Sequence, residues 1–287
     1  MTKDKSVMNM ENRSLISRIF SNKTASISFI FILCLVFIAV IGPYLTVYHP
    51  NVPDTSNRLA SPSAKHFFGT DHHGRDIFTR IIHGMPLSLY IGVISVLIGA
   101  TIGVVLGMIS GYYGGFIDSF IMRCMDVLFA FPGILLALAL VSVLGNSLHH
   151  LILAVSIFLV PMFARIVRSS TLAICQLEYI DAMKVLGASD IRIIFKHIFP
   201  NIVSPIIVQA TLSIASAILT ASTLSFLGLG VQPPTPEWGA MLNEGKDYMY
   251  QAPHVAFFPG LAIMFVVLVF HIFGDGLRDV LDPKSKK

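Results

Sequence analysis

Residues 25–48 read ASISFIFILCLVFIAVIGPYLTVY, and this stretch contains no Asp, Glu, Lys or Arg. A helix crosses a bilayer with about 20 apolar residues, so the stretch predicts a membrane span at 27–45. It has no small-x-small cleavage site and a long segment precedes it, so we expect a retained anchor rather than a cleaved signal peptide. The residues just before it suit either a partly ordered basic tail or a short helix on the membrane surface, formed by Leu15, Ile16, Ile19 and Phe20.

The rest of the chain repeats this pattern in four more charge-free windows, at 81–117, 127–164, 197–236 and 248–274. Charged residues make up 13% of the chain, against about a quarter in soluble domains, and the mean hydropathy is +0.75. These values exclude an ordinary soluble globular protein. The net charge of +4 does not indicate nucleic acid binding, because basic residues set the orientation of a membrane protein. We therefore expect membrane lipid around the chain and no nucleic-acid partner.

Counting basic residues decides the number of spans. If the segment GNSLHH at 145–150 separates two helices, the chain has six spans, and 15 of its 20 Lys and Arg residues lie on the cytoplasmic side. A five-span alternative leaves only 7 there, so the positive-inside rule favours six spans with both termini cytoplasmic. The expected helices are 27–45, 86–110, 119–144, 151–168, 201–224 and 255–274. The remaining parts are a cytoplasmic N-terminal segment at 1–26, an extracytoplasmic loop at 46–85, a five-helix core at 86–274 with a cytoplasmic loop at 169–200, and a cytoplasmic tail at 275–287.

The composition of the spans limits the chemistry that this chain can perform. None of the six has an ionisable acidic or basic residue at its middle, which argues against coupling to an ion gradient, and the sequence has no GxxxxGK[ST] phosphate loop. Any energy for transport must then come from another polypeptide. Glycines at 99, 103, 107 and 111 share one helix face, which favours close helix packing over a substrate path lined by bare backbone. Neither a disulfide framework nor a zinc site is expected from Cys34, Cys124 and Cys175.

The loop between the fourth and fifth spans is too apolar for a solvated connector and predicts two short helices. In the first, Tyr179, Met183 and Leu186 share one face, and Gly187 is placed to end the helix in a left-handed cap. Ser189 is placed to cap the second helix, and we expect Pro200 to stop it. Two rigid helices joined at a glycine and leading into a span suit a contact with a moving soluble partner.

The segment EYIDAMKVLGASDIRIIFKHIFP at 178–200 resembles the EAA loop of ABC-importer permeases. Asp181, Ala182 and Met183 stand at the EAA positions, Gly187 keeps the glycine spacing, and Pro200 keeps the final proline, whereas Met183, His197 and Phe199 depart from the strict pattern. A second segment, FGTDHHGRDIFTRIIHGMPLSLYIG at 68–92, is similar to the C-type subunit of the dipeptide, oligopeptide and nickel permeases. GYYGGFIDSFIMRCMDVLFAFP and the ending GDGLRDVLDP are similar to it too, so the resemblance extends from about residue 66 onward.

The resemblance implies an all-α membrane protein with the type I ABC-importer permease fold, in the cytoplasmic membrane of a bacterium. Its expected partners are a second permease chain in a heterodimer, two ATPase subunits that carry ATP and Mg, and an extracytoplasmic substrate-binding protein. The chain itself would hold no cofactor and no catalytic residue. The expected cargo is a dipeptide or oligopeptide, with nickel or a metal chelate as the alternative. The residues expected to contact an ATPase are Glu178, Asp181, Ala182, Met183, Gly187 and Ala188.

The external loops supply the remaining candidate residues. His72 and His73 lie beside carboxylates, but neighbouring residues on an extended segment point opposite ways, so we expect no metal site. A salt-bridged turn that braces the pore mouth is expected instead, formed by the motif residues Gly69, Thr70, Asp71, Gly74, Arg75 and Asp76. Trp238, at the external mouth, begins a short amphipathic helix that suits an anchor at the bilayer interface or a contact with the binding protein.

Two other classes of membrane protein are less consistent with the sequence. An intramembrane enzyme needs a nucleophile or metal cluster inside its spans, and His271 stands alone near the end of the last one. A channel needs a filter of backbone carbonyls or a ring of acidic residues, and no loop between the spans offers one.

Overall fold

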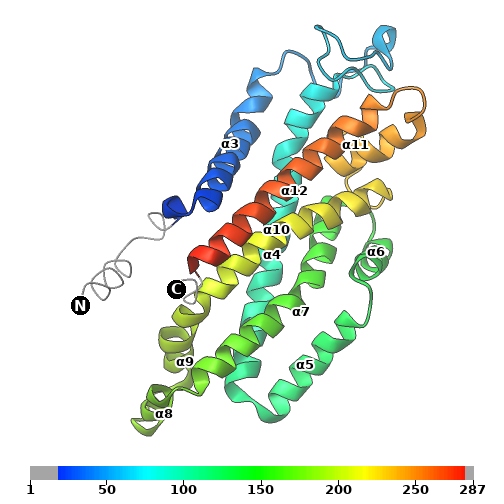
Figure 1. Cartoon of the computed structure of the whole chain (residues 1–287). Coiled ribbons are helices and arrows are strands. Elements are labelled where there is room, and N and C mark those ends of the chain that lie inside the picture. The colour runs from blue at the N-terminus through cyan, green and yellow to red at the C-terminus, as the bar shows by residue number, and fades with distance from the viewer. Residues whose placement is uncertain (1–18, 282–287) are drawn as a thin grey trace.

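The computed structural model describes residues 19–281, which fold into a bundle of long helices (Figure 1). Five helices are long and apolar enough to cross a membrane, and a bent pair, α5 and α6, makes a sixth span if counted as one. The part described contains no β-strand, only an isolated bridge between Thr70 and Asp76. The expected all-α class is therefore confirmed. The five long elements are α3 Lys23–Leu45, α4 Ile77–Tyr113, α7 Leu148–Cys175, α10 Phe199–Phe226 and α12 His254–Leu281.

The shorter elements gather at the two ends of the bundle (Figure 1). One end, called the α8 end here, carries α8 Glu178–Val185 and α9 Asp190–Ile193. The opposite end, the α11 end, carries α11 Trp238–Gly245 and the loop between α3 and α4, with short 3₁₀ turns at Thr55–Asn57 and Lys246–Tyr248. The beginning of α3 and the last turns of α12 pack together near the α8 end through Ala25 and Leu277. The expected surface helix at 15–20 lies mostly outside the described residues.

Several helices are longer than the charge-free windows indicated. α4 begins at Ile77 rather than 86, because the Asp76 carboxylate accepts the Thr79 N–H at 2.8 Å and caps the helix there. α7 continues to Cys175 rather than ending at 168. Apolar windows mark the part of a helix inside lipid, whereas capping residues determine where the helix itself begins and ends.

The third span is not the single helix that we expected at 119–144. It consists of α5 Gly115–Phe129 and α6 Gly133–Leu144, which meet at 88° across residues 130–132. Pro132 explains the break, because proline lacks an N–H and disfavours helical backbone at the residue before it. α6 then ends at Leu144 and α7 begins at Leu148, so the predicted helix break at GNSLHH is confirmed.

The predicted helix stop at Pro200 is wrong. α9 continues through a π-helical turn at Ile194–Ile198 into α10, so that a helical path runs from Asp190 to Phe226. Within the π turn the Phe199 N–H bonds to the Ile194 carbonyl, and Pro200 then occupies the first turn of α10. Proline has no N–H to donate, and the wider π turn directly before it accommodates Pro200 without ending the helical path.

The glycine strip of α4 lies against α7, as predicted. A Cβ at Gly103 would lie 2.5 Å from the Phe163 Cβ and 2.7 Å from the Val160 carbonyl oxygen, and Gly99, Gly107 and Gly111 are equally close to α7. The two helix backbones therefore approach more closely than any side chain would allow. The contact of α4 with α7 therefore holds these two helices together in the bundle.

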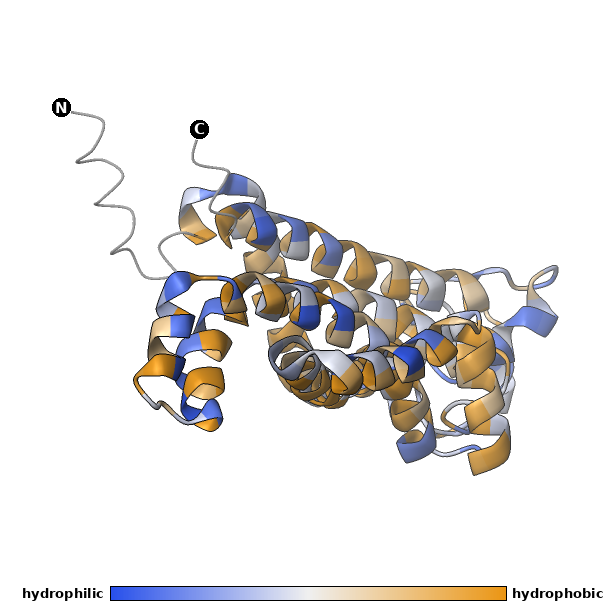
Figure 2. Cartoon of the chain, turned by 90° about the horizontal axis from the view of Figure 1, so that it is seen from below, coloured by the Kyte–Doolittle hydropathy of each residue, from blue (hydrophilic) through white to orange (hydrophobic). Residues whose placement is uncertain are grey.

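Hydrophobic residues predominate along the long helices (Figure 2). On α3, for example, Ile27, Phe37 and Val40 are exposed, as lipid-facing side chains would be. Cys34, Cys124 and Cys175 are all free in this structure.

Candidate functional site

α8 protrudes from its end of the bundle and is held by one buried side chain. Ile180 is completely buried in an apolar cluster with Val167, Ile193 and Ile198. Of the expected contact residues, Glu178, Asp181, Ala182 and Gly187 are exposed, whereas Met183 and Ala188 are half-buried. Tyr179 and Leu186, predicted to form one face with Met183, are exposed instead. The helix thus presents both carboxylates and apolar side chains outward.

The end of α8 is fixed by its glycine. Gly187 has a φ of +78°, its N–H donates to the Lys184 carbonyl at 3.0 Å, and the Ala188 N–H donates to the Met183 carbonyl at 3.0 Å. These two bonds form a Schellman motif, and Met183 and Ala188 both pack against the apolar cluster that holds Ile180. The predicted left-handed cap is confirmed. Ser189 occupies the N-cap position of α9 as expected, but its hydroxyl caps no backbone N–H.

Movement of α8 has a direct route into the spans. α9, the π turn and α10 form one helical path, so α8 is joined through Gly187 to a helix that runs toward the α11 end. The Tyr112 hydroxyl donates to the Asp190 carboxylate at 2.7 Å and ties the end of α4 to α9. Arg168 of α7 likewise donates two bonds to Asp118 of α5, at 2.5 and 2.6 Å.

At the α11 end, the six motif residues form one tight turn leading into α4. Asp71 accepts the Arg75 Nε–H at 2.6 Å, as the expected salt bridge requires, and also accepts the backbone N–H groups of His73 and Arg75. Asp76 does not join this pair, because its carboxylate caps α4 and lies 2.9 Å from the His66 Nδ1. Gly74 has a φ of +80°, and a Cβ there would collide with the Asp54 carbonyl, so only glycine fits.

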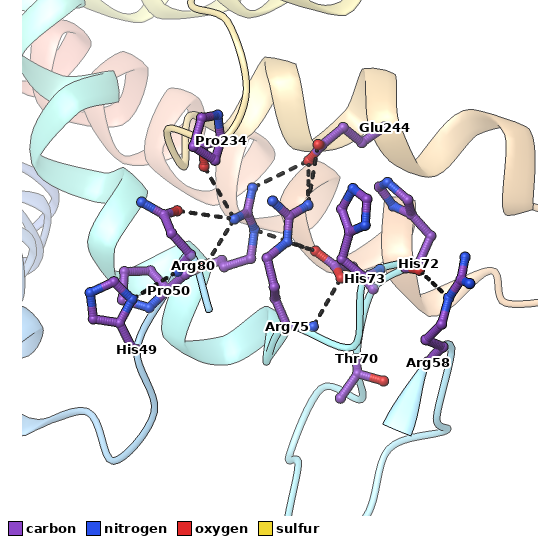
Figure 3. Close-up of polar contacts among 12 residues, drawn as sticks. His49, Pro50, Arg58, Thr70, His72, His73, Arg75, Arg80, Pro234 and Glu244 are labelled. Atoms are coloured by element: carbon purple, nitrogen blue, oxygen red, sulfur yellow. Dashed lines mark hydrogen bonds and ion pairs between the residues drawn. The ribbon is translucent and has the colours of Figure 1, made fainter. Parts of the chain in front are cut away.

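Two buried arginines connect this turn to α11 (Figure 3). Arg75 donates to both carboxylate oxygens of Glu244, at 3.2 and 3.0 Å, and Arg80 donates to one of them at 3.2 Å. Arg80 also donates to the carbonyls of Pro50 and Pro234, so it joins three segments of the α11 end. Asp71 and Glu244 balance the two guanidinium charges, as buried charges require.

α11 is packed into the bundle, and the predicted position of Trp238 at the bilayer interface is wrong. Its side chain is 0% exposed, it lies over Gly84, and its indole N–H donates to the Ile81 carbonyl at 3.0 Å. Glu237 caps the helix by accepting the N–H groups of Gly239 and Ala240 at 3.0 and 2.9 Å. Burial raises the pKa of the Glu237 carboxyl. The sequence pattern gave no warning of this burial, because glycines rather than a long apolar run make room for α11.

The expectation that His72 and His73 point apart is also wrong. The turn is not extended, and the two ring centroids lie 4.0 Å apart. Together with Glu244, each histidine offers a ligand atom, and the three atoms lie within 4.8 Å of one another.

Comparisons with known proteins identify the family. A model for the binding-protein-dependent transport system inner membrane component matches residues 103–287, and a model for the N-terminal TM domain of oligopeptide transport permease C matches residues 13–62. The glutathione transport system permease protein GsiD of Salmonella typhimurium is 55% identical over 257 residues, which cover 89% of this chain and 85% of that protein. GsiD of Escherichia coli O157:H7 is 51% identical over 258 residues, covering 90% and 85%. The chain belongs to the ABC-importer permease family.

Solved structures agree with this permease fold. Two crystal forms of the MetNI methionine ABC transporter, in inward facing conformations, match with TM-scores of 0.57 and 0.55. They are 19% and 18% identical, and the matches cover 71% and 70% of this chain and 97% and 96% of theirs. At this identity the likeness shows the fold alone.

Family membership confirms the main functional prediction. The chain is a membrane permease subunit of the peptide-importer type, located in the bacterial cytoplasmic membrane, and it is pore-forming rather than catalytic. A permease of this family works with ATPase and substrate-binding subunits. The relatives described above are named for glutathione transport and not for nickel.

Three residues of this permease were missed by the sequence analysis. Ile180, the anchor of α8, is one apolar residue among several and has no distinguishing neighbour. Glu244 contacts Arg75 across 169 residues, a separation over which no local pattern carries information. His66 precedes the motif, and only the folded turn brings it to Asp76.

Proposed function

We propose that this permease forms one half of the translocation pore of a small-peptide importer. The other half is a second permease chain, two ATPase subunits hold ATP and Mg, and an extracytoplasmic protein delivers the cargo. The α8 end faces the cytoplasm in this arrangement, in line with the distribution of basic residues.

The shape of α8 carries the proposal. A short helix anchored mainly by Ile180, ended by a Schellman cap and exposing Glu178 and Asp181, suits insertion into a groove with basic residues. The small residues Ala182, Gly187 and Ala188 permit close approach. Since α9 continues into α10, closure of the ATPase pair would pull on the α8 end of the spans.

The cargo is inferred from the relatives. Proteins named as glutathione transport permeases share 51–55% identity along most of this chain, and this supports glutathione or another short peptide as the substrate. Because no charged residue lies at the middle of a span, we expect the delivering protein to set most of the selectivity.

Uptake in cells lacking this chain tests the proposal. We expect radiolabelled glutathione or dipeptide uptake to fall to background in the deletion strain and to return when the gene is restored, while nickel uptake stays the same. Unchanged peptide uptake together with lost nickel uptake would refute the proposed cargo. Peptide uptake restored by a chain lacking residues 178–188 would refute the coupling role of α8.

A further inference from the structure

The α11 end holds a group of three potential metal ligands outside the proposed translocation machinery. His72 and His73 belong to the turn before α4, and Glu244 belongs to the last turn of α11. Figure 3 shows the two imidazoles side by side, near the Glu244 carboxylate. The ligand atoms lie within 4.8 Å of one another, a spacing that small side-chain rotations reduce to that of a coordinated cation.

The folded turn holds the two histidines in this arrangement. Asp71 accepts the backbone N–H of His73 at 2.8 Å, and the positive φ of Gly74 completes the turn, so consecutive side chains emerge together. The His72 ring stacks on Tyr248, with centroids 5.1 Å apart and planes at 12°. The first ligand is therefore positioned before any cation arrives, which lowers the cost of ordering it.

The chemistry of the imidazoles is suitable for a metal. His72 Nδ1 is buried and has no hydrogen-bond partner within the described residues, an arrangement that is costly unless something binds there. His73 is exposed and makes no hydrogen bond through its ring in the described part of the chain, so it is free to turn toward the same cation.

The types of ligand atom restrict which cation can bind. Glu244 already accepts bonds from Arg75 and Arg80, so it supplies a shared carboxylate rather than a free one. Mg²⁺ and Ca²⁺ take mainly oxygen ligands, and among these three side chains only Glu244 supplies an oxygen. Two imidazoles favour the transition cations that prefer nitrogen.

We propose that His72, His73 and Glu244 form a binding site for a divalent transition cation such as Zn²⁺, Co²⁺ or Ni²⁺. Water completes the coordination, as in other three-ligand sites. Because the ligands come from two segments far apart in the sequence, the cation ties the turn at 71–75 to α11 at the outer mouth. This cation is a ligand of the permease itself and not its cargo, so the inference does not depend on the proposed peptide substrate.

Co²⁺ titration of the purified transporter complex, prepared without a polyhistidine tag, tests the site. We expect one Co²⁺ per permease with the visible absorption of nitrogen-bound cobalt, and at least tenfold weaker binding in His72→Ala and His73→Ala. His49→Ala, which removes another exposed histidine from the same end, should leave the affinity unchanged. Because His73 is exposed, its replacement leaves the fold intact.

Thermal unfolding supplies a second measurement. A cation that binds the folded state raises the midpoint temperature by mass action, so Zn²⁺ should stabilise the wild-type and His49→Ala complexes but not His73→Ala. Equal Co²⁺ affinity in the wild-type and His73→Ala complexes would overturn the proposal. So would binding with the spectrum of the hexa-aqua ion alone, or no binding at all.

Discussion

Arg75 and Glu244 are 169 residues apart in the sequence, yet the Arg75 guanidinium donates to both oxygens of the Glu244 carboxylate. The Arg75 side chain is 3% exposed, and that of Glu244 is 14% exposed. This buried pair fastens the beginning of α4 to the end of α11. The α11 end is therefore one connected unit rather than a set of independent loops.

Removing one partner of this pair should destabilise the permease strongly. Arg75→Met and Glu244→Met each leave an uncompensated buried charge, which typically costs about 3–5 kcal/mol. Chemical unfolding of the purified protein in detergent measures the decrease in the free energy of unfolding. The double variant should lose much less than the sum of the two, and strictly additive losses would show that the pair does not act as a unit.

Because α4 lies so close to α7, we predict that alanine lowers the stability of the protein more at Gly103 than at a glycine with open space around it. Gly103→Ala places a methyl group 2.5 Å from the Phe163 Cβ, and overpacking of this kind typically costs about 1–3 kcal/mol. Gly260→Ala is a matched control on α12, because its nearest neighbour, a Leu242 methyl carbon, lies at 3.8 Å. The unfolding midpoint of Gly103→Ala should therefore lie clearly below that of Gly260→Ala. Equal midpoints would contradict the packing described here.

Glu237 should make stability depend on pH. Burial raises its pKa above the ordinary 4.5, so its contribution to stability is fully present below 4.5 and is lost as the pH rises through the raised value. In wild type, the midpoint temperature should therefore decrease as the pH rises through this range. A glutamine at this position cannot ionise, so Glu237→Gln should remove that decrease. Glu178→Gln, which alters an exposed carboxyl on α8, should retain it. The idea fails if wild type and Glu237→Gln show the same slope.

The sequence predicted the features that depend on local pattern. Charge-free windows located the spans, spacing located the glycine strip, and Gly187 indicated its own left-handed cap. Features that depend on distant contacts were missed or misjudged. The burial of Trp238 requires Gly84 opposite its ring, and the path through Pro200 requires a π turn that no composition reveals.

Gly187 gives a test of the coupling element that leaves the spans untouched. A Cβ at this position would meet no atom within 4 Å, so a substitution acts only through the backbone, at a cost of about 1–2 kcal/mol for a non-glycine residue in the left-handed region. Gly187→Val should abolish co-purification of the ATPase subunits at normal membrane abundance. Asparagine tolerates the left-handed conformation, so Gly187→Asn should retain most of the co-purifying ATPase. Retention of the ATPases by Gly187→Val would argue that the cap has no role in docking.

The central claim is that α8 docks on an ATPase from the cytoplasmic side. Photo-cross-linking in intact cells tests it with a reactive amino acid in place of Val185 on α8, which is 87% exposed. Tyr250, fully exposed just after the 3₁₀ turn Lys246–Tyr248 that follows α11, is the matched control position. We predict an ATPase adduct from position 185 and none from position 250. An ATPase adduct from position 250 would contradict the account. So would the lack of an ATPase adduct from position 185 at normal expression.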